Sequence, residues 1–117
     1  MNKIGFIGAG NMATAIINGM LTNNVASAEN INVFDLDQNK LSVMAEKGIN
    51  ACATAKQVAQ ESHFVVLAVK PQNYAEVLDE IKDAVTDSTV MVSIAAGISI
   101  NYVVSSLNAK CACVRVM

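Results

Sequence analysis

The chain has 117 residues, of which 53% are hydrophobic and 4% aromatic, so it is long enough for one domain with a real core but too short for two ordinary ones. The formal net charge is −2 and Lys and Arg form no cluster, which argues against nucleic acid or an anionic membrane as a partner. The three cysteines, Cys52, Cys111 and Cys113, lack zinc-like spacing, so we interpret them as buried thiols of a cytoplasmic protein rather than as disulfides or metal ligands.

Short β-branched runs alternate with segments of helical period along the chain, a pattern typical of a parallel sheet covered on both faces. Glycines interrupt the first apolar run, which therefore predicts neither an export signal nor a membrane span. Right-handed crossovers then give the strand order 3-2-1-4-5-6, so residues 1–117 are predicted to form one α/β domain with a Rossmann-type, doubly wound parallel sheet. The expected strands are 3–7, 31–34, 50–51, 64–68, 89–93 and 112–116, and the expected helices are 12–21, 39–47, 55–60, 74–85 and 102–107.

Several residues are expected to mark helix ends. Thr54 is predicted to cap the third helix, Asn73 the fourth, and Ser99 or Asn101 the fifth, because each offers a side-chain oxygen to unpaired N–H groups. Gly48 suits the end of the second helix. The fourth helix carries an apolar stripe, and its charged residues are interpreted as a solvated face: Glu76, Asp79, Glu80, Lys82 and Asp83.

The first strand runs directly into a Gly-x-Gly-x-x-Ala turn and then a helix, which is the fingerprint of a dinucleotide-binding site. Gly8 allows a tight turn, Gly10 lets the backbone approach a pyrophosphate, and Ala13 keeps the helix close to the strand. Free N–H groups at the start of the helix would face the anion. The sequence therefore predicts a bound dinucleotide.

Asp35 stands at the end of the second strand, where the fingerprint places an acidic residue that binds the adenosine ribose. Its carboxylate favours NADH, because the 2′-phosphate of NADPH would meet like charge unless Lys40 or another cation compensated. The alternative is that Asp35 only caps the turn over residues 35–39.

Two further segments are expected at the carboxyl edge of the sheet, where ligands of open α/β sheets bind. Lys70 and Pro71 follow the fourth strand, and residues 93–97 leave the fifth. The structural alternatives are an ordinary strand-to-helix turn at Pro71 and a tight turn at Gly97. His63, the single histidine, has no nucleophile and carboxylate partner nearby in the sequence and is interpreted as a boundary residue.

Three segments, 4–13, 67–72 and 92–98, resemble in order and spacing the N-terminal domain of pyrroline-5-carboxylate reductase. The resemblance implies reduction of the C=N bond of Δ1-pyrroline-5-carboxylate to L-proline by NADPH or NADH, the last step of proline biosynthesis. It also implies a following helical domain for dimerisation and substrate binding, so we expect this chain to be the cofactor-binding part of a homo-oligomer.

By the same resemblance, the pyrophosphate loop consists of Ile7, Gly8, Ala9, Gly10, Asn11 and Met12. One side of the nicotinamide would be lined by Ala68, Val69, Lys70 and Pro71, and the wall would be completed by Ile94, Ala95 and Ala96. Asp35 departs from the Ser, Thr or Asn of family members that prefer NADPH, and Ala55 replaces an Asn near the ribose.

No side chain is assigned as catalytic, and the sequence contains no metal-ligand cluster. Two other functions stay open at this point. One is a freestanding dinucleotide-binding module with a regulatory role. The other is a different NAD(P)-dependent reductase, of the β-hydroxyacid dehydrogenase or deazaflavin-linked type, because fold-level likeness does not fix function.

Overall fold

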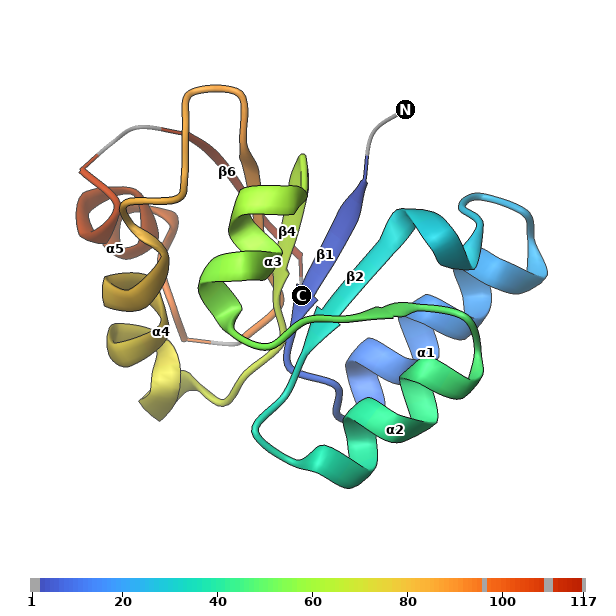
Figure 1. Ribbon diagram of the computed structural model, residues 1–117. Helices are drawn as coiled ribbons and strands as arrows, with labels where there is room; N and C mark the ends of the chain where they lie inside the picture. The colour runs from blue at the N-terminus through green and yellow to red at the C-terminus, as the bar shows by residue number, and fades with distance from the viewer. Residues whose placement is uncertain (1–2, 96, 109–110, 117) are drawn as a thin grey trace.

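The computed structural model describes residues 3–95, 97–108 and 111–116 (Figure 1). Six strands form one sheet in the order β3-β2-β1-β4-β5-β6, and every neighbouring pair is parallel. The strands are β1 Ile4–Ile7, β2 Ile31–Phe34, β3 Asn50–Ala51, β4 Phe64–Leu67, β5 Val90–Ser93 and β6 Ala112–Arg115. The expected doubly wound, Rossmann-type sheet and its strand order are confirmed.

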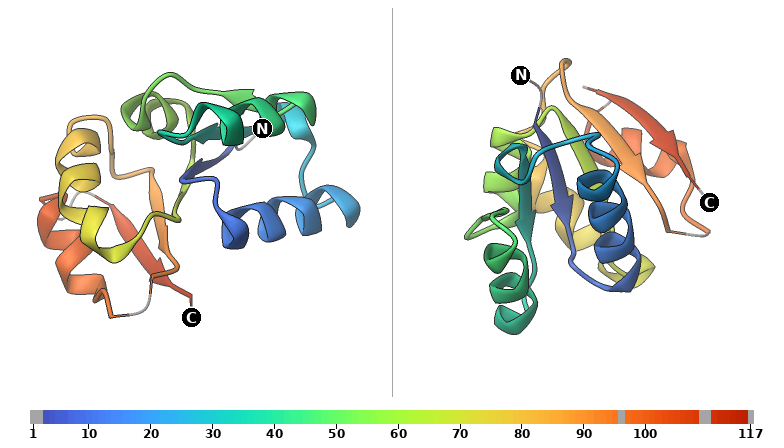
Figure 2. Two further views of the ribbon diagram at one scale, coloured as in Figure 1. Left: turned by 90° about the horizontal axis from the view of Figure 1, so that it is seen from below. Right: turned by 90° about the vertical axis from the view of Figure 1, so that its right-hand side faces the viewer.

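The helices cover the two faces of the sheet. Helices α1 (Asn11–Thr22) and α2 (Gln38–Glu46) pack on one face, and α3 (Ala55–Glu61), α4 (Tyr74–Ile81) and α5 (Ile100–Ser106) pack on the other. Figure 1 shows the first pair on the right and the other three on the left, and the left view of Figure 2, seen from below, shows α1 set apart from α4 and α5. Two short 3-10 turns, Ala28–Asn30 and Pro71–Asn73, were not predicted from the sequence.

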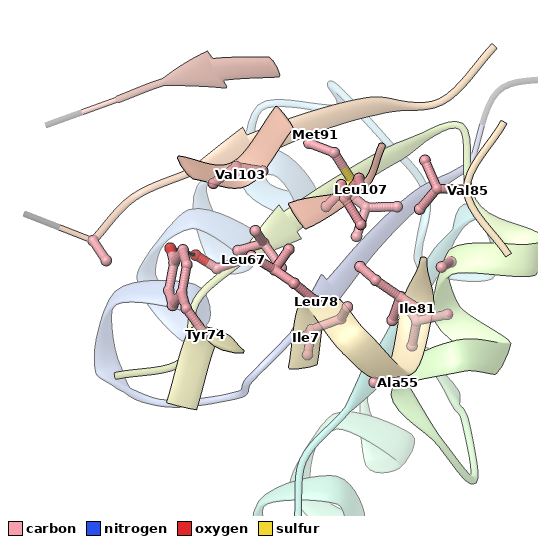
Figure 3. Close-up of a cluster of buried hydrophobic side chains, with 14 of the residues drawn as sticks. Ile7, Ala55, Leu67, Tyr74, Leu78, Ile81, Val85, Met91, Val103 and Leu107 are labelled. Carbon is pink, nitrogen blue, oxygen red and sulfur yellow. Dashed lines mark hydrogen bonds between the residues drawn. The ribbon is translucent and has the colours of Figure 1, made fainter. Parts of the chain in front are cut away.

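The buried core consists of two apolar clusters, one on each face of the sheet. Successive residues of the central strands alternate between them, with Phe6 and Val66 in the cluster under α1 and α2, and Ile7 and Leu67 in the cluster under α3, α4 and α5. Because both faces are covered, these strands are continuously apolar instead of alternating with polar residues. The second cluster, which includes Tyr74, is drawn in Figure 3.

Most predicted boundaries lie within one or two residues of the observed ones, but the fourth helix was predicted too long. It ends at Ile81 rather than at residue 85, although Val85 is buried as its apolar spacing suggested. Thr54 and Ser99 cap α3 and α5 as expected, and Gly48 follows α2 with φ 84°. The predicted cap at Asn73 is wrong, because its backbone is already helical and its side chain makes no capping hydrogen bond.

A buried group of hydrogen-bonded polar side chains lies at the amino end of the sheet, opposite the end where β1 and β4 lead into their loops. The Asn32 amide is buried in β2 and donates to the Ser62 hydroxyl at 3.0 Å and to the Glu61 carbonyl at 3.2 Å. A Cβ on Gly5 would lie 2.3 Å from the Ser62 Oγ and 2.4 Å from Val58 Cγ1. Glycine is therefore required here by packing, and not by any ligand.

Within the described ranges, no helix combines the length and the apolar character needed to cross a membrane.

Candidate nucleotide site

A cleft of about 340 Å³ opens at the carboxyl ends of β1, β2 and β4. This is the edge where ligands of open α/β sheets bind. Predicted site residues that line it are Ile7, Gly8, Gly10, Asp35, Ala68, Val69 and Lys70. The other lining residues are Phe34, Leu36, Lys40, Ala55, Asn73, Glu76, Val77 and Glu80.

Gly8 forms a tight turn that is held between β2 and β4. Its φ is 107°, a left-handed value that favours glycine, and a Cβ there would lie 2.7 Å from the backbone oxygen of Ala68. Its N–H donates to the Phe34 carbonyl at 2.8 Å, while the Ala68 N–H donates to the Ile7 carbonyl at 2.9 Å. The protein itself therefore requires glycine at this position.

Gly10 is different, because nothing in the described protein requires it to be glycine. Its φ of −76° and ψ of −167° are accessible to any residue, and a Cβ there would meet no atom within 4 Å. Since Gly10 lines the cleft, the open space beside its backbone is room that a ligand can occupy. A glycine that neither backbone conformation nor packing requires is consistent with close approach of the backbone to a pyrophosphate.

The start of α1 suits the charge of such a ligand. Gly10 provides no side-chain cap, and the first turn, over Asn11 and the residues after it, contains no acidic residue. The first N–H groups of a helix lack partners within the helix and carry partial positive charge. The residues present therefore fit an anionic group next to Gly10.

Asp35 ties this loop to the end of β2. One carboxylate oxygen, Oδ2, accepts the Ala9 N–H at 2.7 Å, and the other, Oδ1, accepts the Asp37 N–H at 2.8 Å. The second bond confirms the turn-capping interpretation of Asp35, and the first shows that Asp35 also holds the glycine turn. Ribose binding by Asp35 stays a prediction, which its place in the cleft lining favours. Lys40, the cation considered for a 2′-phosphate, lines the same cleft.

The loop after β4 forms another wall of the cleft through Ala68, Val69 and Lys70. Pro71 is not in the lining, and it opens the 3-10 turn that leads into α4. This geometry agrees with the structural interpretation of Pro71 as a strand-to-helix turn. Lys70 is exposed at the mouth of this turn.

The remaining predicted residues that the structure describes lie outside the cleft lining. Ala9 gives its N–H to Asp35, and Asn11 and Met12 are exposed at the start of α1. After β5, Ile94 packs toward one core cluster and Ala95 is buried in the other. Gly97 has φ 83°, as the tight-turn alternative predicts, and Ala96 falls outside the described residues.

One wall of the cleft was missed by sequence reasoning. Asn73, just before α4, and Glu76, Val77 and Glu80 of α4 line it. Both glutamates are exposed, as the solvated-face interpretation expects, but they also border the cleft. The spacing of three and four residues among these four marks one helical stripe, but no feature of the sequence shows that this stripe faces a cleft. The Glu80 carboxylate also accepts the Lys56 N–H at 3.3 Å, which links α4 to α3.

A buried pair of hydroxyl groups connects the ends of β4 and β5. The Tyr74 hydroxyl lies 3.1 Å from the Leu67 carbonyl oxygen and 2.9 Å from the Ser93 Oγ. Tyr74 and Ser93 are each 1% exposed. Burial raises the pKa of Tyr74, so the phenol keeps its proton and serves as a hydrogen-bond donor.

The cysteines and the histidine take no part in the cleft. Cys52 is buried, whereas Cys111 and Cys113 are half-buried against the core cluster of α3, α4 and α5. His63 precedes β4 at the opposite end of the sheet, with its ring edge-on to Phe64 at a centroid distance of 5.0 Å. Among the described residues no group of three or more His, Cys, Asp and Glu side chains is arranged to hold a metal ion.

The chain is similar to known reductases over almost its whole length. A family model described as "NADP oxidoreductase coenzyme F420-dependent" matches residues 3–97. Pyrroline-5-carboxylate reductase of Methanosarcina acetivorans is 35% identical over 116 residues, which cover 98% of this chain and 43% of that protein. Pyrroline-5-carboxylate reductase 3 of Danio rerio is 37% identical over 115 residues, covering 98% of this chain and 40% of that protein.

Solved structures give the same result. A pyrroline-5-carboxylate reductase from Coxiella burnetii superposes with a TM-score of 0.93 at 30% identity, covering 99% of this chain and 43% of that one. A Plasmodium falciparum pyrroline carboxylate reductase with NADP bound gives 0.76 at 25% identity, covering 91% and 38%. The chain thus spans well under half the length of the relatives it matches. These similarities confirm the resemblance expected from the three motifs.

Proposed function

We propose that this chain, which belongs to the family of NADP oxidoreductases described as coenzyme F420-dependent, binds a nicotinamide dinucleotide as the cofactor-binding part of a pyrroline-5-carboxylate reductase. The observation that carries the proposal is Gly10, whose missing side chain no protein contact explains and whose backbone faces the cleft. The relatives named above supply the substrate class, because reductases of this name match the chain from end to end.

The predicted site segments then have separate tasks, including those that do not line the cleft. The loop from Gly8 to Met12 would hold the pyrophosphate, using N–H groups at the start of α1. Asp35 would accept hydrogen bonds from the adenosine ribose. The segments 68–71 and 94–96 would lie beside the nicotinamide ring.

The bound nicotinamide would supply the hydride that reduces the C=N bond of pyrroline-5-carboxylate, giving L-proline. The residues of this chain would hold the ring and its ribose-pyrophosphate arm in place, which is a positioning task. We assign no general acid among them, so the imine would bind already protonated or receive its proton from a part of the protein outside this chain.

Asp35 also bears on which cofactor is preferred. Its two carboxylate oxygens already accept two backbone N–H groups, and a 2′-phosphate beside them would add like charge. Lys40 is the cation in the cleft lining that would offset this repulsion. We propose that NADH binds at least as tightly as NADPH.

The complete protein is proposed to act in the cytoplasm as a homo-oligomer on this small molecule, without nucleic acid or membrane partners. Three free cysteines support the compartment. The share of the relatives that lies outside the match, more than half of each, supports a further domain that would contain the substrate pocket and the dimer interface.

The test has two steps. The 117-residue chain is titrated with NADH and with NADPH, and the product of the complete gene is then assayed for oxidation of either cofactor with pyrroline-5-carboxylate. We expect binding in the first step and turnover in the second. Binding without turnover would favour a regulatory module or a different reductase, and absence of binding by a folded chain would refute the proposal.

A further inference from the structure

Tyr74 is placed unusually for a tyrosine. It is the first residue of α4, it is among the largest fully buried side chains, and its ring packs in the core cluster under α4 and α5 (Figure 3). A phenylalanine would fill the same apolar space without a polar group to desolvate. The hydroxyl therefore has a use beyond packing.

The direction of both hydrogen bonds follows from chemistry. The Leu67 carbonyl can only accept, so the single phenolic proton of Tyr74 is donated to it. The bond at 2.9 Å then runs the other way, from the Ser93 hydroxyl to the Tyr74 oxygen. Ser93, Tyr74 and Leu67 thus form one ordered chain of hydrogen bonds.

This chain of bonds stands where the pairing between two strands ends. Leu67 and Ser93 are register partners and the last residues of β4 and β5. Beyond them, the Ile94 N–H reaches the Leu67 carbonyl only at 3.5 Å. Tyr74 therefore ties the strands together at the point where their backbone ladder weakens and their two loops separate.

The loops that diverge here are the two segments assigned to the nicotinamide. Ala68, Val69 and Lys70 continue from Leu67 into the cleft lining, and Ile94 continues from Ser93. The adenosine and pyrophosphate half of the site depends instead on Gly8, which follows β1, Gly10, which precedes α1, and Asp35, which follows β2. The hydroxyl pair makes its hydrogen bonds only to the strand ends that lead into the nicotinamide half.

We propose that Tyr74 is a positioning residue, whose buried hydroxyl, through Leu67 and Ser93, sets the separation of the two loops that grip the nicotinamide ring. This inference rests on the proposed function. It predicts a selective defect, in which loss of the hydroxyl weakens binding of the nicotinamide half and leaves binding of the ADP-ribose half unchanged.

The experiment compares two ligands on three variants of the 117-residue chain. The ligands are whichever of NADH or NADPH binds the unmodified chain more tightly, and the matching fragment without nicotinamide, ADP-ribose or 2′-phospho-ADP-ribose. The variants are Tyr74→Phe, Ser93→Ala and, as the matched control, Tyr102→Phe, which removes the other phenol hydroxyl from a side chain that is 41% exposed on α5. Titration gives the affinities, and the fluorescence of the reduced nicotinamide reports how the ring is held.

We expect Tyr74→Phe to weaken the dinucleotide by about fivefold, the loss typical of one hydrogen bond, and to lower the fluorescence gain on binding. Ser93→Ala should give a smaller loss of dinucleotide affinity, because the hydrogen bond from Tyr74 to Leu67 remains. If Tyr74→Phe fails to fold, Ser93→Ala is the variant that tests the inference. Affinity for the fragment should not change, and Tyr102→Phe should change neither ligand. An equal loss for both ligands, or no loss, would overturn the inference while leaving cofactor binding intact; failure of the unmodified chain to bind any dinucleotide would instead refute the proposed function.

Discussion

Gly10→Ala separates the needs of the fold from the needs of the ligand. The added Cβ meets no atom within 4 Å, and the backbone at φ −76° accepts alanine without strain. Alanine restricts the unfolded chain, which stabilises by about 0.4–1 kcal/mol. Alanine is also a poorer N-cap than glycine, which costs up to about 1 kcal/mol. These two effects nearly cancel, so the free energy of unfolding should change by less than about 1 kcal/mol.

Ligand affinity should respond quite differently. The new methyl group occupies the space through which a phosphate would reach the N–H groups of Asn11 and Met12. One charge-assisted hydrogen bond contributes about 1.5–3 kcal/mol, so losing it weakens binding by about tenfold to a hundredfold.

The assay pairs urea unfolding with titration of NADH and NADPH. Gly19→Ala is the matched control, because Gly19 lies in the last turn of the same helix, away from Gly10, and its added Cβ also meets no atom within 4 Å. That change should stabilise the chain by about 0.5–1 kcal/mol and leave affinity unchanged. If Gly10→Ala bound either cofactor as tightly as the unmodified chain, the assignment of this cleft to a dinucleotide would be wrong.

Three further changes test other parts of the structure. Asp35→Ser should raise the ratio of NADPH to NADH affinity by about tenfold by removing a like charge. The ratio is measured because loss of the hydrogen bond from the Ala9 N–H should weaken binding of both cofactors. A strong NADPH preference in the unmodified chain would contradict the role given to Asp35. Gly5→Ala should lower the free energy of unfolding by about 1–3 kcal/mol through overpacking against Ser62 and Val58, and an unchanged urea midpoint would show that this packing relaxes freely. Burial raises the pKa of Cys52, Cys111, Cys113 and Tyr74 in the folded state, so the unfolded chain loses these protons at a lower pH than the folded chain. The free energy of unfolding should therefore be constant near neutral pH and fall as the pH rises through about 9 and above. A urea midpoint that stays constant from pH 8 to pH 10.5 would contradict this.

The sheet could be predicted closely because its signals are local. Apolar β-branched runs such as residues 31–34 and 64–67 coincide with strands. Parallel strands are buried on both faces, so nearly all of their side chains must be apolar, and such runs are easily recognised. The fourth helix was predicted too long because the apolar spacing continues to Val85, which is buried although it lies beyond the end of the helix. The spacing of apolar residues reports which side chains are buried, and a buried side chain can also lie in a segment that is not helical.

The candidate site could be predicted where one stretch of chain carries it, as in the turn from Gly8 to Gly10. The wall formed by Glu76 and Glu80 could not, since it depends on how α4 sits against the sheet. The same holds for the bond between Tyr74 and Ser93, which are 19 residues apart. Contacts between side chains of different elements leave no period or motif in a single sequence.

The clamped glycine turn has a kinetic consequence. The Gly8 N–H donates to Phe34 of β2, the Ala9 N–H donates to Asp35, and there is no room for a Cβ between Gly8 and the Ala68 backbone. The loop is therefore held in one shape before any ligand arrives. A preorganised loop loses little conformational entropy when it binds. Association should therefore follow a single step whose rate rises in proportion to dinucleotide concentration, without a slow loop closure that limits it.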